Sequence, residues 1–245
     1  MKRSSRTICL YAKGHPKHDL TIIESILCNR RHFFLEIRSG IGLGEKIRAM
    51  LVSSLVFFAI YGAVLGSSAS VWQALSSAVK LPLLFLATLL ICAPTLYFFH
   101  VLFGSSQGLR QTIALMLTAI TVTSVLLLSF CAIVIFFLLT TAGYQFFKLL
   151  NVGIFAICGV VGVLFLSDGL AIVAQGDAEG ARGRGCVTWL WVVLYAFVGS
   201  QMAWTLRPFI GAPSMPFELF RNLGGNFYSD VFASLGEVLG FFTVR

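Results

Sequence analysis

The segment Leu81–Phe103, LPLLFLATLLICAPTLYFFHVLF, constrains the fold of this chain more than any other stretch. Its 23 residues contain no Asp, Glu, Lys or Arg. An α-helix of this length measures about 34 Å, which is enough to cross the roughly 30 Å hydrocarbon core of a bilayer. Four further apolar stretches repeat the signal, at about Ala49–Gly66, within Ile113–Thr140, and at about Leu149–Ala174 and Val187–Leu206. The sequence therefore predicts an all-α polytopic transmembrane bundle of about five spans, with amphipathic helices at both ends.

The charge of the chain favours a membrane over a nucleic-acid partner. Only 11% of the residues are charged, against about 25% in an ordinary soluble domain. The net charge is +8, but ten of the 18 Lys and Arg residues precede the first predicted span. In that position they would face anionic lipid and help to orient the protein. We therefore expect the lipid bilayer to be a partner and nucleic acid not to be one.

The chain divides into three predicted parts. Residues 1–46 form a basic N-terminal segment with an amphipathic helix, residues 47–206 form the five-span membrane domain, and residues 207–245 form a tail with an interfacial helix. If the N-terminus is cytoplasmic, thirteen Lys and Arg residues lie on the cytoplasmic side and five on the other. The positive-inside rule therefore predicts a cytoplasmic N-terminus and a C-terminus on the opposite side.

Helical patterns also occur outside the spans. From Leu20, apolar residues recur at spacings of three and four, and Thr21 with Glu24 fits a capping box. This helix is expected either on the membrane surface or packed against the cytosolic ends of the bundle. Asn226 is the expected cap of a last helix that lies in the interface or folds back on the bundle. Residues Ser67–Val79 are predicted to be a short polar connection, or an interfacial half-helix.

Small residues mark the predicted contacts between spans. Gly62 and Gly66 form a GxxxG pair, and Gly159 and Gly162 lie in the fourth span, so close helix packing is expected at these positions. In the third span, small and hydroxyl residues share about a quarter of the helix surface: Ala114, Thr118, Thr121, Val125, Ser129 and Ala132. Such a stripe is typical of a helix–helix seam, and a polar conduit along Thr118, Thr121 and Ser129 is the alternative.

Three features mark the ends and the middle of the spans. Pro94 lies mid-span and removes the hydrogen bond to the Leu90 carbonyl, which predicts a helix kink that acts as a hinge, a pocket wall or a shape feature. Trp189 and Trp191 at one end of the fifth span and Trp204 at the other have the spacing of two aromatic belts. Lys80 is expected to extend its ammonium group outward, toward water.

His100 and Asp168 are the ionisable residues within predicted spans, and both are near span ends. His100 either interacts with the helix dipole and the last carbonyls or serves as an axial ligand to a tetrapyrrole or metal. Asp168 either ends its helix and pairs with a loop arginine such as Arg182, or takes part in proton or cation movement.

The sequence contains no recognised catalytic motif. HExxH, GxSxG and Walker-type patterns are missing, so the chain is not expected to be an enzyme. The six cysteines are scattered without CxxC or Cys/His spacing, which indicates neither a zinc site nor a disulfide framework. The sequence requires no cofactor.

Several passages resemble a known family. They are KLPLLFLATLLICAPTLYFFHVLFGS, QTIALMLTAITVTSVLLLSF, YQFFKLLNVGIFAICGVVGVLFL, WTLRPFIGAP, FELFR and NFY. Together they resemble a family of uncharacterised multi-pass membrane proteins of cyanobacteria and some other bacteria, over about residues 25–240. The resemblance implies a plasma or thylakoid membrane and carries no activity or cofactor with it. Helix count and order also resemble the five-span Yip1-type membrane domain.

Three functions are compatible with these features. The first is a non-enzymatic scaffold or accessory subunit that binds other membrane proteins or self-associates. The second is a small transporter or channel that uses the Pro94 bend, the hydroxyl stripe and Asp168. The third is a pigment-associated subunit with His100 as a ligand.

Overall fold

The structure is a computed structural model that describes residues 18–102, 108–140, 143–173, 181–210 and 227–239. Within these ranges the chain is helical and contains no strand. The helices are α2 (His18–Cys28), α3 (Arg30–Arg38), α4 (Leu43–Gly66), α5 (Val71–Leu102), α6 (Leu109–Thr140), α7 (Tyr144–Val173), α8 (Ala181–Thr205) and α9 (Phe227–Val238).

Within the described ranges, four helices are long and apolar enough to cross a membrane: α4, residues Val71–Phe99 of α5, α6 and α7. Their outer surfaces carry exposed apolar side chains such as Leu90, Leu139 and Val160, as a lipid-facing surface requires. The chain is therefore an integral membrane protein by length and composition of its helices. The fifth predicted span falls in α8, which is not among these four.

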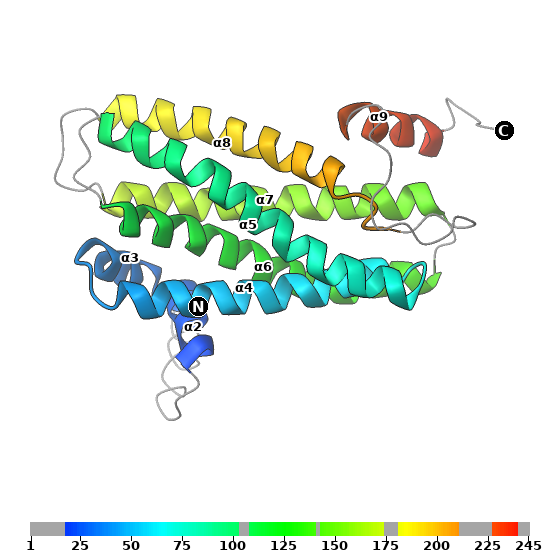
Figure 1. Cartoon of the computed structure of the whole chain (residues 1–245), viewed down its shortest axis with the longest axis horizontal. Helices are drawn as coiled ribbons and strands as arrows, with labels where there is room; N and C mark the ends of the chain where they lie inside the picture. Colours follow the sequence, from blue (N-terminus) through cyan, green and yellow to red (C-terminus); the bar gives the residue numbers. More distant parts are fainter. Residues whose placement is uncertain (1–17, 103–107, 141–142, 174–180, 211–226, 240–245) are drawn as a thin grey trace, which may run out of the picture.

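Long helices α4 to α8 run along one axis and alternate in direction (Figure 1). Helix α4 packs between α5 and α6, α7 packs on α6, and α8 packs on α5. Helices α2 and α3 lie at the end where α4, α6 and α8 begin, and α9 lies at the other end (Figure 1).

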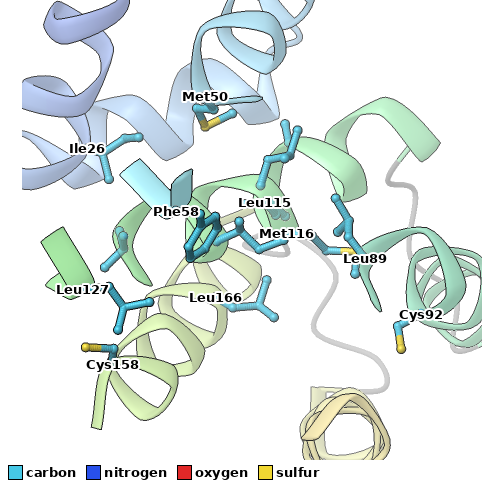
Figure 2. Packing of buried hydrophobic residues seen from close by; sticks show 14 of the residues in the cluster. Ile26, Met50, Phe58, Leu89, Cys92, Leu115, Met116, Leu127, Cys158 and Leu166 are labelled. Carbon is cyan, nitrogen blue, oxygen red and sulfur yellow. The ribbon is translucent and has the colours of Figure 1, made fainter. Parts of the chain in front are cut away.

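The core consists of apolar side chains contributed by α2 to α8, including Ile26, Met50, Phe58, Leu115 and Leu166 (Figure 2). Stacked aromatic rings extend this core. The Phe85 ring of α5 lies 4.1 Å from that of Phe58 and 6.3 Å from that of Phe155, measured between ring centroids. These contacts tie α4, α5 and α7 together through side chains.

The N-terminal helical region differs from the sequence-based prediction. It forms two helices, α2 and α3, which are separated at Asn29. Thr21 lies inside α2, so the predicted capping box does not start the helix. The apolar side of α3, Phe33, Phe34 and Ile37, is buried in the bundle. Because that side is already covered by protein, the contacts favour the packed alternative over a helix that lies free on the membrane surface.

The segment predicted as a polar connection is also different. Helix α5 already begins at Val71, and only Ser67–Ser70 separate it from α4. Two of the polar residues in this segment, Gln73 and Ser77, are buried, and their side chains bond the chain that follows α8. The predicted cap Asn226 lies outside the described residues.

Candidate functional site

The glycine pair of α4 lies directly against the backbone of α5. A Cβ added at Gly62 would collide with the Ser77 carbonyl, and one added at Gly66 would collide with the Gln73 carbonyl and the Cα of Ala74. Gly162 of α7 lies equally close to Thr123 of α6. These three positions allow helix backbones to approach closely.

Gly159 lies in a different environment from Gly162. No atom of a neighbouring element lies within 4 Å of a Cβ built at Gly159. Of the two glycines that predicted close packing of this helix, Gly162 therefore lies at the contact between α6 and α7. Gly159 does not, and it is available as a control position.

The hydroxyl stripe of α6 divides into two regions. The Thr118 Oγ1 donates to the Ala114 carbonyl at 2.8 Å and lies 3.5 Å from the Met50 sulfur of α4. The Thr121 Oγ1 donates to the Leu117 carbonyl at 2.8 Å and lies 3.4 Å from the Met50 carbonyl. Ser129 is instead on the exposed surface, where it donates to the Val125 carbonyl. The three hydroxyls therefore do not line one continuous space.

A buried hydrogen bond that the sequence analysis missed joins α4 to α7. The Tyr61 hydroxyl donates to the Asn151 Oδ1 at 2.8 Å, and the Asn151 amide donates to the Phe147 carbonyl. Both side chains are buried. A single Asn in an apolar helix was the available signal, because such a group needs a polar partner in lipid.

Tyr61→Phe is expected to destabilise the bundle by about 0.6 to 1.7 kcal/mol, because the Asn151 oxygen loses its donor within the membrane. SDS-dependent unfolding in mixed micelles measures this difference. Ser129→Ala is the matched control, since that hydroxyl is exposed and bonds its own helix. Equal stability of the two variants would show that the bond contributes nothing.

A second missed group lies on α5, at the end of the bundle that also carries α9. Gln73, Ser77 and Lys80 are buried. The Gln73 amide donates to the Pro208 carbonyl at 2.7 Å, and the Ser77 hydroxyl donates to the Phe209 carbonyl at 2.7 Å. Spacings of four and three place these side chains on one face of the helix.

Lys80 does not extend outward as predicted. Its Nζ lies 3.5 Å from the Pro208 carbonyl, and the side chain is 4% exposed. The Pro208 carbonyl, which also accepts a bond from Gln73, attracts the ammonium group inward. This cluster therefore holds the segment that leaves α8 against α5.

Asp168 pairs with a residue that sequence reasoning did not select. Its carboxylate lies 3.0 Å from the Arg30 guanidinium of α3, and both side chains are about half exposed. The side chain of Arg182, the partner suggested from the sequence, lies outside the described part. Asp168 also does not end its helix, because α7 continues to Val173. The pair joins α3 to the end of α7.

The remaining predicted positions lie apart from these contacts. Pro94 is inside α5, which continues on both sides of it, and its ring is exposed. His100 is in the last turns of α5, and its side chain is outside the described set. Trp191 does not belong to an aromatic belt, since it is buried and donates to the Cys92 carbonyl of α5 at 3.0 Å. Trp189 is 70% exposed.

Among the described residues, no three His, Cys, Asp or Glu side chains are grouped so that they could hold a metal ion. Cys92, Cys131 and Cys158 are free thiols and are buried. The polar contacts between elements described above are hydrogen bonds between helices, such as Tyr61–Asn151, and ion pairs at the bundle ends, such as Arg30–Asp168.

A second cross-element ion pair fixes the other end of the bundle. The Lys148 ammonium of α7 lies 2.5 Å from the Asp230 carboxylate of α9. The hydroxyls of Ser200 in α8 and Tyr228 in α9 are 3.0 Å apart. Helix α9 therefore bridges α7 and α8.

Comparison with protein-family models, curated proteins and solved structures finds no match for this chain.

Proposed function

We propose that this protein is a non-enzymatic, five-span integral membrane protein that acts as a scaffold or accessory subunit by binding other membrane proteins. The proposal is supported by how the buried polar groups are used. Tyr61 and Asn151 bond each other between α4 and α7, Gln73 bonds the Pro208 carbonyl, and the Thr118 hydroxyl lies 3.5 Å from the Met50 sulfur of α4. Their contacts hold the bundle together, which is the property that a scaffold requires.

Helix α8 is the proposed fifth span. Its 25 residues measure about 37 Å as an α-helix, more than the roughly 30 Å hydrocarbon core. It runs alongside α5 within the bundle (Figure 1). Five crossings place the chain ends on opposite sides, with a cytoplasmic N-terminus from the charge bias. The family resemblance favours a plasma or thylakoid membrane.

The observation that carries the proposal is the outer face of α8. This helix packs on α5 and touches α9, and several of its described side chains away from these contacts are exposed. Trp189, Val193 and Phe197 are exposed there at intervals of four residues, so they form one continuous apolar stripe. This apolar stripe lies on a helix whose main packing partner is α5, and it is a suitable surface for a transmembrane helix of another protein.

A photoreactive amino acid at Val193 tests this proposal in native membranes. We expect ultraviolet light to produce a discrete adduct from position 193. The same group at Leu164, an apolar position on α7 that is 58% exposed against 46% for Val193, is the matched control and is expected to react with lipid alone. No protein adduct at position 193, together with a lone monomer after gentle purification, would contradict the proposal.

The two other functions receive less support from the contacts. Transport along the α6 stripe requires a shared polar path, whereas Thr118 and Thr121 face α4 and Ser129 is on the outer surface. The pigment hypothesis depends on His100 and is tested by the visible absorption of the purified protein.

A further inference from the structure

A cluster of arginines on the surface of α3 and α6 is not used by the contacts described so far. On α3, Arg31, Leu35 and Arg38 are exposed at spacings of four and three, so they share one face. Arg110, in the first turn of α6, is also exposed. We refer to Arg31, Leu35, Arg38 and Arg110 as the basic end surface.

The basic end surface is held rigidly to the bundle. The Gln111 amide of α6 donates to the Arg38 carbonyl at 2.8 Å and to the Ile37 carbonyl at 3.3 Å. These bonds fix the C-terminal end of α3 next to the residue that follows Arg110. On the other side of α3, the Phe34 ring lies against Gly169 of α7. The arginines are therefore presented by a fixed part of the fold.

Helix length places this surface at the depth of lipid headgroups. Helix α6 has 32 residues and is about 48 Å long, whereas the hydrocarbon core is about 30 Å thick. A centred helix therefore extends about 9 Å beyond the core at each end. Arg110 and the α3 helix beside it lie within this extension, in the headgroup layer.

The charges at this end favour an anionic partner. Glu36 is paired with Lys46 at 2.7 Å and with His32 at 3.2 Å, and Asp168 is paired with Arg30. Within the described ranges, no acidic side chain pairs with Arg31, Arg38 or Arg110. Leu35 and Ile41 are 42% and 63% exposed between and beside these arginines, and they are suited to the apolar margin of the same layer.

We propose that the basic end surface binds the headgroup of an anionic phospholipid from the bilayer that the protein spans. The guanidinium groups of Arg38 and Arg110 donate paired hydrogen bonds to the lipid phosphate. Arg31 adds charge, and Leu35 and Ile41 contact the upper part of the acyl chains. This inference does not depend on the partner surface of α8.

Native mass spectrometry of the full chain, titrated with phosphatidylglycerol, tests the proposal. Each arginine near a lipid surface contributes about fivefold in affinity, so Arg38→Gln with Arg110→Gln is expected to weaken binding about thirtyfold. Binding of zwitterionic phosphatidylcholine should not change. As a control, Lys148→Gln with Arg207→Gln removes two charges at the opposite end, together with the Lys148–Asp230 pair, and should retain phosphatidylglycerol binding.

Two results would overturn the proposal: an unchanged affinity in the Arg38/Arg110 variant, or an equal loss in the control. If the glutamine variant does not fold, the wild-type protein provides a second measurement. Its preference for phosphatidylglycerol over phosphatidylcholine should fall at high salt, because exposed charges are screened. A preference that is absent at low salt, or that is unaffected by high salt, would also overturn it.

Discussion

Replacement of Phe34 by alanine is expected to lower the free energy of unfolding by about 3–5 kcal/mol, the range for removal of a buried Phe side chain. The ring is fully buried and lies against Gly169 of α7, which Leu115 of α6 also approaches, where α3 meets α6 and α7. Its removal leaves a cavity at this three-helix contact. Helix α3 has nine residues and cannot remain stable without packing. We therefore also expect faster tryptic cleavage at Arg30, Arg31 and Arg38.

The neighbouring Leu35 provides the control for this prediction. Its side chain is 42% exposed, so Leu35→Ala should change the stability and the cleavage rate little. Both variants are compared by SDS-dependent unfolding and by limited proteolysis. If Phe34→Ala behaved like Leu35→Ala, α3 would not be docked in the bundle, and the basic end surface would not be fixed.

Gly62→Ala is expected to destabilise the contact between α4 and α5 by about 1–3 kcal/mol, the usual range for overpacking. The added methyl group would collide with the Ser77 carbonyl, which belongs to a helix backbone and cannot rotate away. Gly66→Ala should have a similar effect, because its added methyl group would collide with the Gln73 carbonyl and the Cα of Ala74. Unfolding in mixed micelles measures both changes.

Gly159→Ala is the matched control, since the added methyl group would meet no neighbouring element within 4 Å. Its stability should stay the same or rise slightly, because Ala is a better helix former than Gly. A loss at Gly159 as large as that at Gly62 would mean that the effect comes from the α-helix itself and not from close packing.

Hydropathy was sufficient to predict the long helices. The predicted spans at about Ala49–Gly66, Leu81–Phe103, Ile113–Thr140 and Leu149–Ala174 all lie largely within α4 to α7. Lipid imposes this result, because every backbone group in the core must be bonded within the segment. The predicted boundaries were less accurate, since helices continue past the apolar core into charged turns such as the one that contains Glu45.

Long-range polar partners could not be read from the sequence. Residues Ser67–Val79 suggested a polar connection, and Lys80 was expected to extend toward water. Gln73, Ser77 and Lys80 are instead buried against carbonyls more than 120 residues later in the chain. Asp168 was expected to pair locally, whereas α3 brings Arg30 to it. In both cases the local pattern was compatible with two structures, and tertiary packing selected one.

The packing of α3 shows the same limit. Its amphipathic pattern fits a membrane surface as well as it fits a bundle end, because both environments cover one apolar side. Phe33, Phe34 and Ile37 are buried by protein, a result that depends on the shapes of α6 and α7. Amphipathicity alone gives no information about which apolar partner is present.

Topology mapping with single cysteines tests the central claim of an odd number of membrane crossings most directly. Leu35→Cys reports on the α3 end and Phe232→Cys on α9, both at exposed positions, in a background without the natural cysteines. In sealed vesicles, an impermeant maleimide is expected to label position 35 from the cytoplasmic side alone and position 232 from the opposite side alone. Labelling of both positions from the same side would contradict the five-span arrangement.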